Sequence, residues 1–178
     1  MKSELRIKEK GFTLIELLIY SVLSVIIGLV VTITFLQIIN VVETTRRSRE
    51  SLDSAKRAMD VISQEIKHAE SIYTETSDFG PNPGQLSLET TRDLPADENT
   101  TYVDFYIDDD RLYMKREDQA AQIVTSEKVK VEELVFTRLN ISTDNSAVRV
   151  KIKTSYADPI SGPTSPVTLY STAALRSY

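Results

Sequence analysis

The sequence predicts an α+β fold in which one long N-terminal helix packs on an antiparallel β-sheet head. Three observations lead to this fold class. From Leu17 to Val42 the chain carries no charged residue, a run longer than the roughly 20 residues that a helix needs to cross a membrane. Glu43 to Tyr73 contains no proline or glycine. From Gln85 onward the pattern changes to a period of two, so helix comes first and strands follow, as in α+β proteins.

The helix is expected to run from about Thr13 to Tyr73 and to change its character halfway. Apolar residues surround its first half on all sides, which suits a lipid environment. In the second half, apolar residues recur at steps of three and four and form one stripe: Leu52, Ala55, Met59, Ile62, Ile66 and Ala69. We therefore expect a transmembrane and assembly helix over residues 12–42. Residues 43–73 are expected to be its amphipathic second half, with the stripe facing the head.

Residues 74–178 are expected to form a β-rich globular head. The breakers in DFGPNPG, Asp78 to Gly84, end the helical pattern. Beyond them, the alternation of apolar and polar residues and the turn signals predict strands. These strands are expected around Val103–Ile107, in RLYMKR after the aspartates, over Val131–Leu139, around Val148–Ile152 and over Val167–Leu175.

Composition narrows the function classes. The chain has 26 acidic and 21 basic residues and a net charge of −5, which does not suggest that nucleic-acid binding is its main work. It has no cysteine and one histidine, His68, so it offers no disulfide framework and almost no material for Ser–His or Cys–His catalysis. No glycine-rich phosphate loop is present. The sequence therefore predicts neither an enzyme nor a cofactor.

Two charged clusters could be binding sites. Asp108, Asp109 and Asp110 are weak candidates for a calcium site, but further ligands at loop spacing are missing, and a polar hairpin turn is favoured. The basic stretch RRSR, residues 46–49, could contact lipid headgroups or DNA. A solvated helix face is favoured there, so nucleic acid is a partner that the sequence allows but does not favour.

The stretch KGFTLIELLI, Lys10 to Ile19, resembles the prepilin processing motif of type IV pilins and type II secretion pseudopilins. The match consists of a basic leader ending in Gly11, then Phe12, then Glu16, followed by a long apolar helix and a β-rich head. The resemblance implies that prepilin peptidase removes residues 1–11 by cutting between Gly11 and Phe12. It also implies that Phe12 becomes N-methylated and that Glu16 neutralises the N-terminal amine of a neighbouring subunit.

The resemblance further implies a structural subunit of a type IV pilus or a type II secretion pseudopilus. The segment RRSRESLDSAKRAMDVISQEIKHAESI resembles the second half of the first helix in minor pilins and J-type pseudopilins, which favours a minor subunit. The implied partners are prepilin peptidase, other pilin or pseudopilin subunits, the inner-membrane assembly platform and lipids of the cytoplasmic membrane. Excess positive charge before the apolar run predicts a single-pass protein with its N-terminus inside. Its head would be periplasmic or extracellular, carried by the filament after assembly.

The cost of burying a charge supports the role of Glu16 independently. A carboxylate inside the bilayer costs several kcal/mol unless it is paired or protonated, and an amine from the next subunit would pair with it. The alternative is that Glu16 lies in the headgroup zone and reaches water. For the whole chain, the second hypothesis is a membrane-anchored binding domain that never polymerises and acts as a receptor for DNA or a surface ligand.

Overall fold

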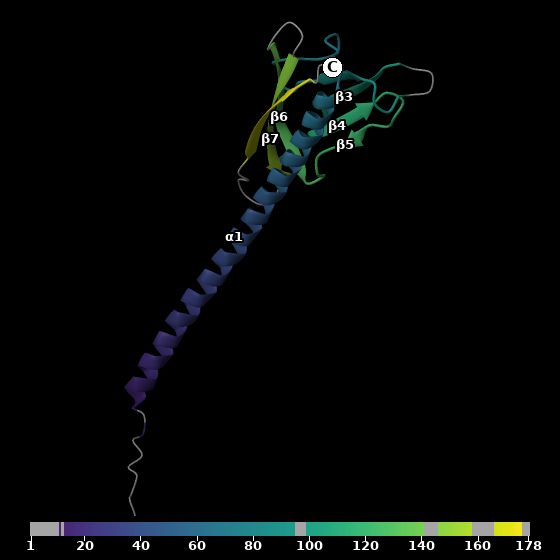
Figure 1. The fold of residues 1–178 in the computed structure, drawn as a ribbon. Coiled ribbons are helices and arrows are strands. Elements are labelled where there is room, and N and C mark those ends of the chain that lie inside the picture. The colour runs from purple at the N-terminus through teal and green to yellow at the C-terminus, as the bar shows by residue number, and fades with distance from the viewer. Residues whose placement is uncertain (1–10, 12, 95–98, 141–145, 158–165, 176–178) are drawn as a thin grey trace, which may run out of the picture. The chain divides into compact units, whose positions relative to one another are not determined.

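The expected α+β architecture is confirmed, with one N-terminal helix followed by antiparallel strands (Figure 1). The structure is a computed structural model. The chain divides into two compact units, residues 1–43 and residues 44–178. The residues that the structure describes are 11, 13–94, 99–140, 146–157 and 166–175.

Helix α1 spans Leu14–His68, and the described strands form two antiparallel sheets. One sheet has the order β1-β2-β3-β4-β5 and the other the order β6-β7-β8. The sequence patterns did not foresee this division into two sheets. The strands are β1 Ser71–Ile72, β2 Leu86–Thr90, β3 Thr101–Asp108, β4 Arg111–Arg116, β5 Gln122–Ile123, β6 Val129–Asn140, β7 Ser146–Tyr156 and β8 Val167–Ala174.

The helix ends at His68, five residues before the end that the sequence predicts. The prediction of Tyr73 was wrong because backbone donors just beyond His68 bond to a strand instead of continuing the helix. The N–H of Glu70 donates to the carbonyl of Glu89 at 2.9 Å, and the N–H of Tyr73 donates to the carbonyl of Ser87 at 3.0 Å. Pairing with β2 therefore replaces the last turn and makes the short strand β1.

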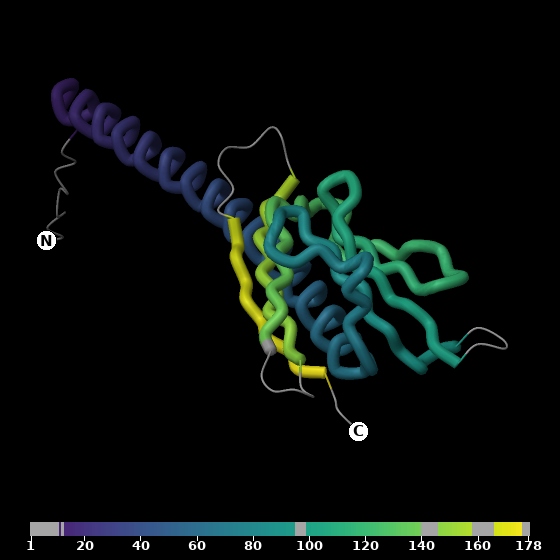
Figure 2. The backbone as a smooth tube through the Cα atoms, turned by 90° about the horizontal axis from the view of Figure 1, so that it is seen from above, coloured from purple at the N-terminus to yellow at the C-terminus, as the bar shows by residue number. Residues whose placement is uncertain are grey.

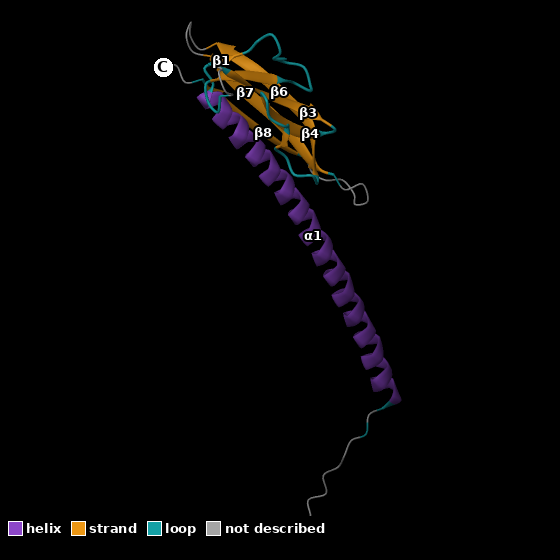
Figure 3. Cartoon of the chain, turned by 90° about the vertical axis from the view of Figure 1, so that its right-hand side faces the viewer, coloured by secondary structure: helices purple, strands orange, loops and turns teal. Residues whose placement is uncertain are grey.

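In the unit of residues 44–178, the stripe of α1 packs against both sheets. Figure 3 shows the C-terminal part of α1 running alongside the strands, and Figure 2 shows both groups of strands beside it. The largest fully buried side chains include Ile62 and Ile66 from the helix, Phe105 from the first sheet and Phe136 from the second. They belong to one hydrophobic core. The expected stripe is confirmed except at Leu52, which is only half-buried.

The loop between β1 and β2 covers the outer edge of β6. The N–H groups of Gly80 and Gly84 donate to the carbonyls of Phe136 and Leu134 at 3.0 and 2.8 Å. The side-chain oxygen of Asn82 accepts the N–H of Leu134 at 3.0 Å. The breaker-rich segment therefore gives β6 partners where a sheet neighbour is missing, which protects an otherwise open strand edge.

Candidate functional site

The helix that carries Glu16 begins with an N-cap at Thr13. The hydroxyl of Thr13 accepts the backbone N–H of Glu16 at 3.3 Å, and its carbonyl accepts the N–H of Leu17 at 3.2 Å. Thr13 and Glu16 stand at the spacing of a capping box, in which the third helical residue is Glu or Gln. The prediction from sequence missed this role of Thr13, although the Thr-x-x-Glu spacing could have indicated it.

Glu16 lies in the first turn of α1 and is the acidic residue of that turn. A carboxylate there interacts favourably with the partial positive charge of the helix N-terminus. The Glu16 side chain is half-buried, whereas Ile15 and Leu17 beside it are 69% and 64% exposed. Phe12, the other residue of the expected pairing, lies outside the described residues.

Gly11 is exposed, and its own chain does not require glycine there. A Cβ built at Gly11 would meet nothing within 4 Å, and its φ is not in the left-handed region. A larger residue would therefore fit the structure of the isolated chain.

The unit of residues 1–43 presents apolar side chains in all directions. Each large apolar side chain from Leu14 to Val42 is at least 42% exposed. By length and composition, α1 is the one helix among the described residues that is long and apolar enough to cross a membrane. Such a surface needs lipid or other helices around it, because a contiguous apolar patch of this size is not stable in water.

Hydroxyl groups on this apolar segment bond to the helix itself. Ser21 donates to the carbonyl of Leu18, Thr32 to that of Gly28 and Thr34 to that of Val30, each at 2.8 Å. These bonds satisfy the hydroxyl protons without a solvent partner, as happens for Ser and Thr in transmembrane helices. The helix continues through Gly28 without interruption.

The three aspartates form a tight hairpin turn. Asp108 is the last residue of β3 and pairs with Arg111, and Asp109 and Asp110 have φ of 46° and 58°. Two consecutive positive φ angles are typical of a type I′ turn, where aspartate is tolerated. The side chain of Asp110 forms an ion pair with Lys130 at 3.2 Å. No group of metal-ligating side chains that could hold an ion occurs within the described part of the chain.

The basic stretch 46–49 lies on the N-terminal part of the helix in the head unit. Arg46 and Arg49 are exposed, and Arg47 is half-buried. The guanidinium carbon of Arg47 lies 5.8 Å from the centre of the Tyr156 ring, within the range of a cation–π contact. Arg47 thus contacts the head surface, whereas Arg46 and Arg49 lie on a solvated helix face.

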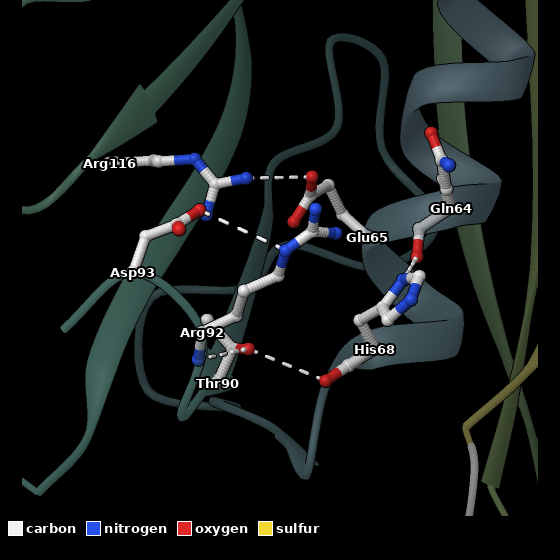
Figure 4. Close-up of polar contacts among 7 residues, drawn as sticks. All are labelled: Gln64, Glu65, His68, Thr90, Arg92, Asp93 and Arg116. Atoms are coloured by element: carbon white, nitrogen blue, oxygen red, sulfur yellow. Dashed lines mark hydrogen bonds and ion pairs between the residues drawn. The ribbon is translucent and has the colours of Figure 1, made fainter.

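A nearly buried ion pair joins the end of α1 to the first sheet (Figure 4). Nη2 of Arg116 lies 2.7 Å from Oε1 of Glu65, and the two side chains are only 13% and 11% exposed. Nη1 of Arg116 is buried, has no hydrogen-bond partner among the described residues and lies 3.6 Å from the carboxylate of Asp93. The sequence did not predict this pair, because 51 residues separate its members and no local pattern connects them.

Comparison with known proteins identifies the N-terminal segment. Residues 6–33 match the family model of the prokaryotic N-terminal methylation motif. No curated protein and no solved structure matches the chain. The matched residues contain Gly11, the Thr13 cap and Glu16, so the motif coincides with the start of the exposed apolar helix.

The chain therefore carries the class III signal of pilin-type proteins, joined to an α+β architecture of pilin type. The motif and the apolar helix together support a membrane-anchored pilin- or pseudopilin-type subunit that prepilin peptidase processes. The motif implies a structural role and assembly with other pilins. The matched residues 6–33 lie outside the head.

Proposed function

We propose that this chain is a minor structural subunit of a type IV pilus or a type II secretion pseudopilus. Residues 1–11 are the leader and residues 12–42 the transmembrane and assembly helix. The rest of α1, which ends at His68, is its amphipathic continuation, and the β-rich head follows. Before assembly, the protein spans the cytoplasmic membrane with its N-terminus in the cytoplasm. It then enters a filament on the assembly platform. There its head is periplasmic or extracellular.

The observation that carries this proposal is the exposed apolar helix with one acidic side chain in its first turn. Its apolar surface requires lipid before assembly and neighbouring helices after it. Once residues 1–11 are removed, Glu16 is the acidic residue nearest the expected new N-terminus at Phe12. An amine from the next subunit, held close to this carboxylate in a low dielectric, forms a charge-assisted hydrogen bond and fixes the axial register.

The environment of Gly11 supports recognition by a peptidase. The processing motif implies a narrow peptidase site that accepts glycine at this position, and the chain itself has open space around Gly11, so a larger residue there should disturb cleavage and not folding. Gly11→Val is therefore expected to leave the head folded and to block cleavage. Intact mass would show a chain that still begins at Met1, whereas the wild type would begin at methylated Phe12.

The role of Glu16 is tested after cleavage. Glu16→Ala should be cleaved and methylated normally. Its amount in sheared filaments, divided by its amount in membranes, should be at least tenfold lower than for the wild type. Asp53→Ala changes an acid on the second half of the same helix and should leave incorporation unchanged. Normal incorporation of Glu16→Ala would refute the pairing. An uncut wild-type chain found only in membranes would favour the alternative of a binding domain that never polymerises.

A further inference from the structure

Four of the eight tyrosines lie on the outer face of the five-stranded sheet. Tyr102 and Tyr106 alternate along β3 with Phe105, which is buried in the core. Tyr113 of β4 lies directly across from Tyr106, with the rings stacked and their centroids 5.8 Å apart. Tyr73 packs against Tyr102 at 5.1 Å with the rings tilted by 59°. These tyrosines therefore share the face that points away from the core.

A pocket of about 430 Å³ opens beside Tyr102 on this face, and this volume lies in the range of small-molecule sites. Asp104 and Lys115 are cross-strand partners. The N–H of Glu117 donates to the carbonyl of Tyr102 at 3.0 Å, which extends the same ladder. The lining of the pocket includes Tyr73, Tyr102, Asp104, Lys115, Glu117 and Asp118.

The aromatic corner of the pocket is held in place before any ligand binds. The hydroxyl of Tyr73 donates to Oε2 of Glu75 at 2.7 Å, and the ring leans on Tyr102. Both rings are half-buried, so part of each remains accessible from the pocket. A preorganised aromatic surface lowers the entropy that a ligand loses on binding.

The charges around the pocket select the kind of ligand. Three carboxylates, those of Asp104, Glu117 and Asp118, face one ammonium group, that of Lys115. This balance disfavours phosphates, nucleic acid and acidic sugars, because like charges repel in a partly desolvated site. The described residues form no group that could hold a metal ion. A neutral or positively charged ligand therefore fits the charge balance, and the carboxylates can accept hydrogen bonds from its hydroxyl or ammonium groups.

We propose that this pocket binds a saccharide unit, either neutral or amino-substituted. The C–H face of a sugar ring packs on Tyr102 and Tyr73 as an apolar group packs on an aromatic ring. Sugar hydroxyls donate to the carboxylates of Asp104 and Glu117 and accept from Lys115. An amino substituent gains further from the excess of carboxylates and from the aromatic rings.

A folded protein partner fits this surface less well. Specific protein interfaces bury about 1,200 Å² or more, whereas the polar groups here converge on one small pocket. The proposed ligand is therefore a single sugar unit or the end of a short glycan. Binding would give the head a surface ligand whether or not the chain polymerises.

The test uses the full-length chain in detergent micelles and three trisaccharide probes measured by ligand-observed NMR and calorimetry. The probes are N-acetylated chitotriose, its deacetylated form and trigalacturonate. We expect the first two to bind with a Kd in the millimolar range or tighter and trigalacturonate to bind at least tenfold more weakly. Tyr102→Ala should weaken binding about tenfold or more, whereas Tyr102→Phe should keep it within about threefold.

Tyr170→Ala is the matched control, because Tyr170 is 66% exposed on the other sheet and should leave Kd unchanged. Glu117→Gln should weaken the deacetylated probe more than the acetylated one. The proposal is overturned if the wild type binds neither chitosaccharide or if Tyr102→Ala binds like the wild type. Equal binding of spermidine and the deacetylated probe would overturn it too, because the site would then select only for positive charge. The unassembled chain is used, so a failure here is independent of filament assembly.

Discussion

Arg116 of β4 and Glu65 of α1 form an ion pair at 2.7 Å that connects the helix to the five-stranded sheet. The pair lies next to the point where α1 ends, since His68 is the last helical residue. Thr90 of β2 donates from its hydroxyl to the carbonyl of His68 at 3.4 Å, as Figure 4 shows. The end of the helix is thus held by charge as well as by the pairing of β1 with β2.

Removing one member of this pair should destabilise the head strongly. Glu65→Ala leaves the guanidinium of Arg116 nearly buried, with Asp93 at 3.6 Å as its remaining partner. We expect a loss of about 3 kcal/mol in the free energy of unfolding, near the lower end for broken buried pairs. Urea unfolding of the full chain in micelles, followed by tyrosine near-ultraviolet circular dichroism, measures it.

Lys153→Ala serves as the control for this prediction. Lys153 forms an ion pair with Glu132 at 2.7 Å, but these side chains are 35% and 38% exposed, so its loss should cost about 1 kcal/mol or less. If Glu65→Ala and Lys153→Ala lose equal stability, the nearly buried Arg116–Glu65 pair contributes no more to the stability of the head than an exposed ion pair does. The double variant Glu65→Leu, Arg116→Met should be more stable than Glu65→Ala alone.

A second contact joins the helix to the other sheet through small polar groups. The hydroxyls of Ser51 and Thr154 lie 2.9 Å apart and are buried, and the Thr154 hydroxyl is also placed to donate to the carbonyl of Ser51 at 3.2 Å. Thr154→Val keeps the shape but leaves Ser51 without this partner. We expect a loss of about 1–3 kcal/mol in the free energy of unfolding.

The same urea titration measures this second prediction. Thr168→Val is the control, because Thr168 is an exposed strand residue and should change stability by about 0.5 kcal/mol or less. Wild-type stability in Thr154→Val would mean that the buried hydrogen bond contributes nothing net. The variant Ser51→Ala should be milder, because Thr154 can still donate to the backbone carbonyl.

Periodicity in the sequence predicted which faces are buried. The three- and four-residue steps of Ala55, Met59, Ile62 and Ile66 and the alternation around Phe105 both appear in the buried core. Such patterns depend only on local geometry, namely 3.6 residues per helical turn and two per strand repeat. The apolar run after Glu16 is recognisable for the same reason, because its length and its lack of charge are local properties of the chain.

What each face packs against could not be predicted in the same way. The early helix end depends on Glu70 bonding to Glu89, and the pair of Arg116 with Glu65 spans 51 residues. The division into two sheets places a loop, not a strand, along the edge of β6. These features arise from contacts between distant segments, and the local periodicity of apolar residues does not predict such contacts. The Thr13 cap, by contrast, could have been predicted from the local Thr-x-x-Glu spacing.

Two ion pairs on the outer face of the second sheet should make stability depend on pH at both extremes. A hydrogen bond from Lys153, and then one from Ser155, lowers the pKa of Glu132 from 4.5. A lowered folded-state pKa stabilises the head above the unfolded pKa, and this contribution is lost as pH falls through the folded pKa. A hydrogen bond to Glu133 raises the pKa of Lys151 above 10.5, and desolvation lowers it by a smaller amount.

Because the Lys151 pKa is raised, its contribution is present below the unfolded pKa and is lost as pH rises through the folded pKa. Glu132→Gln should therefore reduce the loss of stability below about pH 4.5, and Glu133→Gln should reduce the loss above about pH 10.5. The urea midpoint measured against pH for each variant and the wild type gives the difference. Acid and alkaline profiles that match the wild type in both variants would contradict these linkages.

Gly84 should accept a side chain only at a cost in stability, although its backbone conformation would accept one. A Cβ there would lie 3.1 Å from Cδ2 of Phe136, 3.2 Å from the carbonyl oxygen of Leu134 and 3.3 Å from that of Asp78. The Leu134 oxygen is held by the N–H of Gly84 itself at 2.8 Å, so it cannot move away without loss of that bond. Gly84→Ala should cost about 1–3 kcal/mol through overpacking.

Gly28→Ala is the matched control for Gly84→Ala, because a Cβ at Gly28 meets nothing within 4 Å and this glycine lies in the other unit. It should leave the unfolding of the head unchanged. Urea unfolding of both variants measures the difference, and hydrogen exchange at Leu134 and Phe136 localises it. If Gly84→Ala unfolds like the wild type, the loop after β1 shifts to make room for the methyl group without loss of stability, and its contact with the β6 edge is not rigid. Faster exchange in β6 of Gly84→Ala alone would instead show that the edge of the second sheet depends on the close approach of this glycine.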